Sequence, residues 1–372
     1  MTIPWYDYLV AIPVFALLVL VHEFGHFITA KWAGIRVEEF AIGFPPRLLS
    51  FTRGETTYSI NALPIGGYVR MPGENGETTN EAGVYDPRAF ASKPASKRLI
   101  VLLAGVTMNF LLAIVFFTAA EAVGQVELRP AVASVAANSP AQAAGIIKGD
   151  TFLSIDGQPV KYFSDVQKLT SANVAHTLTV DPNATTSPIQ VVVREPSGAV
   201  RDLTVNARTK PAAGQGAMGI EADQTNPYHL SAPIWKAPVL GVQDVGKVIS
   251  ATVTGIQQIV RGALPLSQGV QGPVGIVSDT AMVSAAIPFA GWYYLLFLVG
   301  ALNLSLAIMN LLPIPALDGG RVLLVLIEVL RRGKRLSPER EGLINLIGMA
   351  ALLLLVAVIT FNDVGALLTG GH

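Results

Sequence analysis

The five residues from His22 to His26 read His-Glu-Phe-Gly-His, a spacing that suits metal-assisted hydrolysis. Residues four apart on a helix lie on one face, so the imidazoles of His22 and His26 can reach a single ion. Zinc binds such nitrogens at about 2.0–2.1 Å. Glu23 lies beside them, where its carboxylate could accept a proton from metal-bound water. The motif predicts a metal site with an adjacent base; the alternative is a buried polar cluster that only stabilises helix packing.

Asp318 is the candidate third ligand, because a catalytic zinc site uses three protein ligands and keeps one position open for water. It follows the segment Asn310–Leu317, in which Pro313 and Pro315 cannot continue an undistorted helix. The Gly-Gly pair after it would let the chain turn the carboxylate toward the metal. Irregular backbone is tolerated at membrane depth where it lines a cavity. The alternative is a cytoplasmic turn in which Asp318 caps the helix that runs to Leu330.

Both motifs adjoin long apolar stretches. Hydrophobic residues make up 51% of the chain and charged residues 14%, against about 25% charged residues in soluble domains. Four stretches approach the ~20 residues that cross a hydrocarbon core: Tyr8–Val21, Leu99–Ala120, Trp292–Leu312 and Leu343–Ile359. Ionisable residues in such spans cost at least ~2.5–3.5 kcal/mol each and are by default functional. We therefore expect a polytopic α-helical membrane protein with about four transmembrane helices.

Charge and cysteine content exclude several classes of function. The net charge is zero, so no basic field favours nucleic acid. The absence of Cys excludes thiol catalysis, cysteine metal sites and disulfides. No Lys or Arg precedes the first apolar run and no small-residue cleavage site follows it, so we do not expect a cleaved signal peptide. Basic residues gather between the first two spans and before the last one, so both connections should lie inside and both termini outside.

The segment from about Val126 to Lys210 reads as a separate β-rich domain outside the membrane. Turn residues separate five expected strands: Ala131–Val135, Thr151–Ile155, Leu178–Val180, Ile189–Val193 and Leu203–Val205. One helix is expected over Pro140–Ala144, capped by Ser139. After this domain, the spacing of apolar residues over Pro233–Gly262 predicts a helix with one apolar face.

The stretch Ser134–Val160 resembles a bacterial PDZ domain in its ordered SPA, AG, GD and IDG elements. In such domains an extended peptide pairs with a strand edge, often through its C-terminus. The resemblance implies that Leu128, Arg129 and Pro130 belong to a loop that binds peptide C-termini. The alternative is a domain that only excludes bulky proteins from the entrance.

HEFGHF near the N-terminus and NLLPIPALDGGR near the C-terminus together resemble the site-2 protease family of intramembrane zinc metalloproteases. Two further segments match its bacterial branch with a single PDZ domain: Gly66–Glu74 and Gln271–Ile276. The resemblance implies that His22, His26 and Asp318 bind one zinc ion and that Glu23 is the general base. It implies a multi-pass enzyme of the bacterial inner membrane, in contact with lipids. Its substrates would be single-span membrane proteins, such as anti-sigma factors, cut within their transmembrane segments.

The resemblance also places Asn310, Pro313 and Pro315 beside the substrate. Asn310 could donate to a substrate strand or to a developing oxyanion, and a helix-capping role is the alternative. Relatives often carry Asn where this chain has Ser305, whereas Asn303 lies about two turns before Asn310 on the same face. The part that this helix plays in oxyanion binding therefore stays open.

The strands Thr56–Ala62 and Tyr68–Met71 are expected to pair as a hairpin around Gly66 and Gly67. The resemblance suggests that this β-element is re-entrant and reaches the active site. A strand edge there would satisfy backbone groups that are released when a substrate helix unwinds. The alternative is an ordinary cytoplasmic hairpin.

The expected organisation has four parts: a membrane part over 1–125, a PDZ-like domain over 126–210, a linker with an amphipathic helix over 211–285 and a membrane part over 286–372. Two other functions compete with proteolysis. A transporter would relay ions through the intramembrane His, Glu and Asp and predicts metal-independent flux. A PDZ-bearing scaffold without activity predicts that replacing His22 has no effect.

Overall fold

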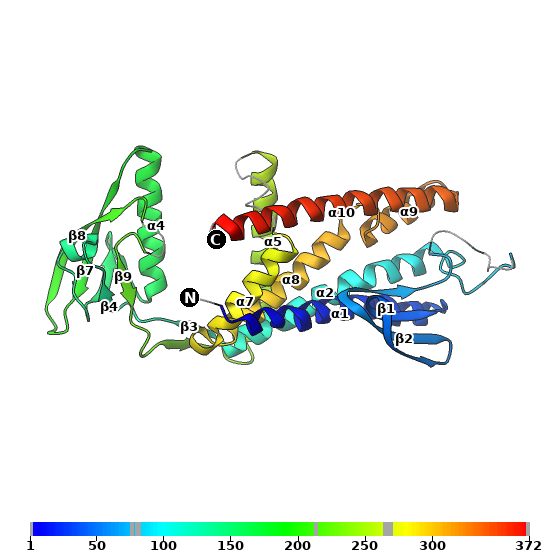
Figure 1. Cartoon of the computed structure of the whole chain (residues 1–372), viewed down its shortest axis with the longest axis horizontal. Helices are drawn as coiled ribbons and strands as arrows, with labels where there is room; N and C mark the ends of the chain where they lie inside the picture. The colour runs from blue at the N-terminus through cyan, green and yellow to red at the C-terminus, as the bar shows by residue number, and fades with distance from the viewer. Residues whose placement is uncertain (1–2, 75–77, 79–82, 212–214, 263–270, 370–372) are drawn as a thin grey trace. The chain divides into compact units, whose positions relative to one another are not determined.

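The protein is described by a computed structural model that covers residues 3–74, 78, 83–211, 215–262 and 271–369. Part of the expected linker 211–285 lies outside these ranges. The chain forms two compact units (Figure 1). One unit combines Met1–Val123 with Ala232–His372, and the other is Gly124–Ser231. Each unit has its own buried apolar clusters.

Four helices in the described part of the first unit are long and apolar enough to cross a membrane. The first consists of the 3-10 helix η1 (Trp5–Val10) and α1 (Ala11–Ala33), which continues it. The other three are α2 (Ala95–Val123), α8 (Tyr293–Leu311) and most of α10 (Pro338–Thr369). Each overlaps one of the four apolar stretches that the sequence singles out. The structure thus fits the predicted polytopic membrane protein.

Helix α2 lies at the centre of this unit. It contacts α1, α8, α5 (Ala237–Val260) and α9 (Asp318–Leu330). Small residues let the helices approach closely. A Cβ added at Gly25 of α1 would lie 2.6 Å from the carbonyl oxygen of Ala104, and one at Gly300 of α8 would lie 2.9 Å from the Phe117 ring. Helix α7 (Pro273–Ala290) packs against η1, α8 and α10.

A small sheet follows α1, which ends where Gly34 takes the left-handed conformation with φ of 71°. It contains β1 (Glu39–Arg53) and β2 (Thr56–Arg70), and β2 contacts α1. Residues Glu39–Ile42 pair with Thr57–Ile60 and also with Gly67–Arg70. The expected pairing of Thr56–Ala62 with Tyr68–Met71 is therefore wrong, because the beginning of β1 lies between them.

The second unit is rich in strands, as expected. Its largest sheet has four strands in the order β6-β5-β7-β8. Two further sheets have two strands each, β3 with β10 and β4 with β9. The strands are β3 (Gln125–Glu127), β4 (Val132–Val135), β5 (Thr151–Ile155), β6 (Gln158–Pro159), β7 (Thr186–Arg194), β8 (Val200–Arg208), β9 (Ile220–Ala222) and β10 (Tyr228–Leu230). Four of the five expected strands are confirmed by β4, β5, β7 and β8.

Two helices accompany these strands. The short helix α3 (Pro140–Ala143) begins as expected, since the backbone N–H of Gln142 donates to Ser139 Oγ at 3.1 Å. The strand expected over Leu178–Val180 is wrong, because these residues end helix α4 (Phe163–Val180). The carboxylate of Asp165 accepts from the backbone N–H of Tyr162 at 2.9 Å and starts this helix.

Candidate metal centre

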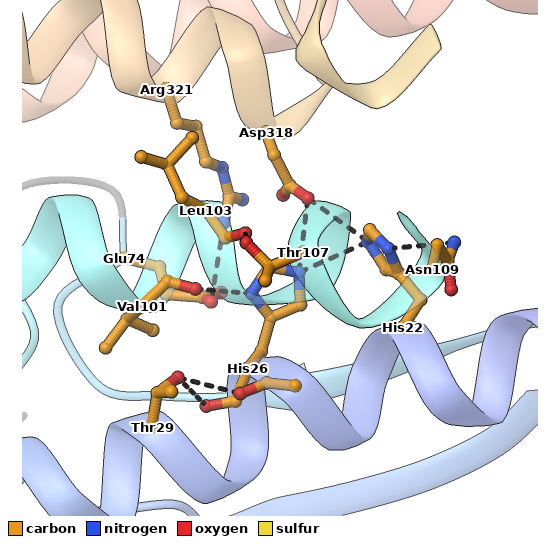
Figure 2. A network of polar contacts seen from close by, with 11 residues as sticks. His22, His26, Thr29, Glu74, Val101, Leu103, Thr107, Asn109, Asp318 and Arg321 are labelled. Carbon is orange, nitrogen blue, oxygen red and sulfur yellow. Dashed lines mark hydrogen bonds and ion pairs between the residues drawn. The ribbon is translucent and has the colours of Figure 1, made fainter. Parts of the chain in front are cut away.

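Three potential metal-binding atoms converge where α1 meets the start of α9 (Figure 2). His22 and His26 lie on the buried face of α1. Their Nε2 atoms are 3.1 and 3.2 Å from Asp318 Oδ2 and 3.2 Å from one another. The three atoms form a nearly equilateral triangle, although 292 residues separate His26 from Asp318 along the chain.

The dimensions of this triangle fit a zinc ion. Tetrahedral zinc with bonds of about 2.0–2.1 Å holds its ligand atoms about 3.3 Å apart. Two imidazoles and one carboxylate are a ligand set of hydrolytic zinc sites, and this set leaves the fourth position open. Asp318 Oδ2 is buried and lacks an aligned hydrogen-bond donor, despite its short distances to both imidazoles. The residues present therefore suit the metal.

Helix α2 orients the imidazole of His26. Its Nδ1–H donates to the carbonyl oxygen of Val101 at 2.8 Å. This hydrogen bond places the ring proton on Nδ1 and leaves Nε2 with a lone pair directed toward Asp318. A second partner of this kind fixes the orientation of metal-binding imidazoles in many proteins.

Gly105 of α2 packs directly against both imidazoles. A Cβ added here would lie 2.4 Å from His26 Nε2 and 2.7 Å from His22 Cε1. Contacts under 3.0 Å do not occur for real Cβ atoms, so only glycine fits at this position without displacing the rings.

Glu23 lies on α1 against the last part of β2. A Cβ added at Gly67 would lie 3.3 Å from Glu23 Cγ and 2.8 Å from the carbonyl oxygen of Ala41. Gly66 has φ of 93°, and its Cβ would meet the Phe44 ring at 2.5 Å. The absence of a side chain at Gly67 therefore lets the β2 backbone approach the side chain of Glu23, which the sequence predicts as the base.

The turn between α8 and α9 places Asp318. Cβ atoms on Gly319 and Gly320 would lie 2.3 Å from the carbonyl oxygens of Leu311 and Ile314, so the turn closes only with glycines. No side chain caps α9, whose first residue is Asp318. The alternative assignment of Asp318 as a helix cap is therefore not supported.

The other residues predicted beside the substrate lie on this connection. Asn310 is half-buried in the last turn of α8, Pro313 is exposed and Pro315 is half-buried. Asn303 is fully buried, and its amide donates to the carbonyl oxygen of Val299 at 2.8 Å, whereas Ser305 is exposed. The amide nitrogen of Asn303 is therefore used within α8.

Charged side chains beside the centre tie α9 to its surroundings. The carboxylate of Glu328 accepts two hydrogen bonds of 2.7 Å from Arg98 at the start of α2 and one of 2.9 Å from Arg335. Burial acts to raise the pKa of Glu328, but these hydrogen bonds outweigh it and lower the pKa below its usual value. Arg321 Nη1 lies 3.4 Å from Glu74 Oε1, and burial raises the pKa of the Glu74 carboxyl. These contacts fix the helix that begins at Asp318.

The loop predicted to bind peptides in the second unit already has internal partners. The carbonyl oxygen of Leu128 accepts from the backbone N–H of Phe163 at 2.9 Å, and that of Pro130 accepts from Phe152 at 2.8 Å. Arg129 Nε donates to the carbonyl oxygen of Asn226 at 2.9 Å, and its guanidinium lies 4.8 Å from the ring centroid of Tyr228. These contacts hold the domain together, and a role in peptide binding stays a prediction.

Sequence reasoning missed the contribution of α2 to the centre. Val101, Gly105 and Asn109 follow one another at intervals of four and so share one helix face. Val101 acts through its backbone and leaves no sequence signal. Gly105 and Asn109 were visible as a glycine and an amide within an apolar span, where polar residues are by default functional.

Comparison with known proteins agrees with this geometry. A zinc metalloprotease named RasP from Geobacillus kaustophilus is 31% identical, over 95% of this chain and 96% of the relative. A Clostridium acetobutylicum protein designated a zinc metalloprotease is 34% identical, over 97% of this chain and 98% of the relative. The model of peptidase family M50 matches residues 10–355. The chain therefore belongs to peptidase family M50, the site-2 protease family.

Proposed function

We propose that this protein hydrolyses peptide bonds within the transmembrane segments of single-span membrane proteins. His22, His26 and Asp318 hold one zinc ion, and Glu23 is the general base. The family makes the chain a zinc metallopeptidase of the membrane. The observation that carries the residue assignment is the triangle of two imidazole nitrogens and one carboxylate oxygen, with sides of 3.1–3.2 Å.

Zinc, when bound, polarises the scissile carbonyl and lowers the pKa of water toward ~7. Glu23 lies next to His22 on α1 and accepts a proton from the attacking water, then returns it to the leaving amine. Val101 holds the His26 ring in the orientation that binds metal through Nε2. The ion pairs of Glu328 keep α9, and with it Asp318, in register with α2.

The edge of β2 offers a place for an extended substrate. Gly67–Arg70 pair with Glu39–Ile42 on one side, and no other strand of the described chain pairs with them. Because Gly67 lies against Glu23, a substrate strand added to this edge would run past the base. Gly67 allows this close approach, and Gly66 before it leaves room for the Phe44 ring. This supports a re-entrant β-element beside the centre, with Asn310, Pro313 and Pro315 on the opposite side of the substrate.

The distribution of Lys and Arg supports the membrane orientation. The connection that contains β1 and β2 and the link before α10 are basic, so they lie on the cytoplasmic side of a bacterial inner membrane. Both termini and the unit Gly124–Ser231 then lie outside. We assign this unit a PDZ-like role, either in binding the C-termini of partner peptides or in excluding bulky proteins.

Glu23→Gln tests the proposal in proteoliposomes that contain a single-span substrate. General acid–base catalysis contributes about 10²–10⁴-fold, so turnover should fall at least ~10²-fold while zinc stays bound. Glu121→Gln is the matched control, because Glu121 lies in α2 about 18 Å along the helix from Asn109. Undiminished cleavage by Glu23→Gln would refute the assignment. A transporter or a scaffold is set aside because the family is one of peptidases.

A further inference from the structure

We propose that Asn109 is the positioning residue for His22. Its side-chain oxygen accepts a hydrogen bond from His22 Nδ1–H in the loaded site and so keeps Nε2 as the nitrogen that binds the metal. The inference rests on the proposed function, in which His22 is a zinc ligand. It names Asn109 as the residue that decides which ring nitrogen of His22 binds the metal.

One face of α2 carries the contacts that this helix makes to the imidazoles. Val101, Gly105 and Asn109 lie at successive turns of this face. Val101 accepts from His26 Nδ1 at 2.8 Å, and Gly105 leaves room for both rings. Asn109 Nδ2 lies 3.4 Å from His22 Nδ1. A dashed line marks this contact in Figure 2. Each histidine therefore has one partner on α2, placed at the ring nitrogen that points away from Asp318.

The burial of Asn109 needs an explanation. Its side chain is 0% exposed within a span, where a polar group without a hydrogen bond is costly. Its Oδ1 has no hydrogen-bond partner in the described part of the chain. Buried amides are normally satisfied. A role in holding His22 accounts for an amide at this depth.

The two orientations of the amide correspond to two forms of His22. With Nδ2 toward the ring, as in the structure, Nδ1 carries the lone pair and Nε2 carries the proton, which it donates to His26 Nε2 at 3.2 Å. A half-turn about the last side-chain bond exchanges nitrogen and oxygen without changing the shape of the amide. Oδ1 then accepts from Nδ1–H, and Nε2 has the lone pair that zinc requires.

A substitution can remove the α2 partner of His22, which is a side chain, but not that of His26, which is a backbone carbonyl. The Val101 carbonyl is part of the backbone and can only accept, so it holds His26 in one tautomer. His22 Nδ1 has Asn109 as its only hydrogen-bond partner among the described residues. Losing such a partner typically lowers metal affinity by about 10–100-fold.

The test compares Asn109→Leu, which removes the acceptor at similar volume, with Asn109→Asp, which keeps it. Zinc affinity is measured by chelator competition on the full-length protein in micelles, together with kcat and KM for a single-span substrate. We expect Asn109→Leu to lower zinc affinity about 10–100-fold and to lower kcat with KM unchanged. Asn109→Asp should retain wild-type affinity. Asn303→Leu removes an equally buried amide from α8 and should leave zinc affinity unchanged.

Wild-type zinc affinity in Asn109→Leu would overturn the inference, and so would an equal loss in Asn109→Asp. If Asn109→Leu does not fold, ¹⁵N-histidine NMR of the zinc-loaded wild type shows which ring nitrogen of His22 binds the metal. Nε2 should bind the metal and Nδ1 should carry the proton, whereas zinc on Nδ1 of His22 overturns the assignment. His22→Ala separates the two proposals: if it keeps zinc, the metal site itself is wrong, and if only Asn109→Leu keeps zinc, the positioning role alone is wrong.

Discussion

Replacing Gly105 with alanine should remove zinc from the protein while leaving the fold in place. The new Cβ would lie 2.4 Å from His26 Nε2, and ordinary contact begins near 3.4 Å. The imidazoles and α2 must therefore move apart by about 1 Å, whereas metal–ligand distances tolerate only about 0.2 Å. Misplacement of a group by 1 Å at a reacting centre lowers the reaction rate by about 10²-fold.

We expect zinc affinity to fall at least ~10²-fold in Gly105→Ala, which is about 2.8 kcal/mol. This agrees with the about 1–3 kcal/mol that overpacking costs in a tight interior. Chelator competition measures the affinity directly. Thermal unfolding gives a second readout, because zinc at 100 times its Kd stabilises the native state by about 2.7 kcal/mol. The unfolding temperature of the wild type should rise when zinc is added, and that of the variant should not.

Gly246→Ala is the control, since a Cβ at this position of α5 meets nothing within 4 Å. It should bind zinc and cleave substrate as the wild type does. A Gly105→Ala protein with wild-type zinc affinity and turnover would refute the close packing of α2 on the imidazoles.

Three further predictions follow from contacts around the centre. Gly67→Ala should lower cleavage but not zinc affinity, because its Cβ would lie 2.8 Å from the carbonyl oxygen of Ala41 and 3.3 Å from Glu23 Cγ and would displace β2 beside the base; loss of zinc would contradict the placement of β2 beside the base. Arg98→Gln should destabilise the protein by about 1.5–3 kcal/mol in denaturant unfolding, because the partly buried Glu328 carboxylate loses its hydrogen bonds from Arg98 and keeps only the one from Arg335; an unchanged midpoint would show that the pair is dispensable. Hydrogen bonds from an arginine and a lysine lower the pKa of Glu55 from 4.5 to about 2. The stability from Glu55 is present above pH 4.5 and is lost as pH falls toward 2, so Glu55→Gln should flatten the decrease of the unfolding temperature across that range. An identical acid profile in the variant would exclude this contribution.

Local patterns predicted most of the elements. Apolar length indicated the spans, and runs of β-branched residues indicated strands such as Ile189–Val193, which lies inside β7. The prediction of a strand at Leu178–Val180 failed, because the capping residues Tyr162 and Asp165, which start α4, went unrecognised. Strand pairing failed for a different reason. The partner of Tyr68–Arg70 is Glu39–Ala41, about 30 residues earlier, and alternation within a strand does not say which segment lies beside it.

The metal centre was partly visible in the sequence. The spacing of His22 and His26 places both rings on one face of a helix, and a carboxylate after two prolines at membrane depth drew attention to Asp318. Their assignment as ligands, and that of Glu23 as base, stays a prediction. The supporting face of α2 could not be derived, because it depends on how α1 and α2 cross and on a backbone carbonyl at Val101.

The length of α2 connects the metal centre to the thickness of the bilayer. Its 29 residues extend about 44 Å, beyond a hydrocarbon core of about 30 Å. A thinner membrane tilts such a helix rather than shortening it. Because this helix contacts both histidines and holds α9 through Arg98, tilting it acts on all three candidate ligands of the centre. Lipids of different acyl length should therefore tune turnover without contacting the centre.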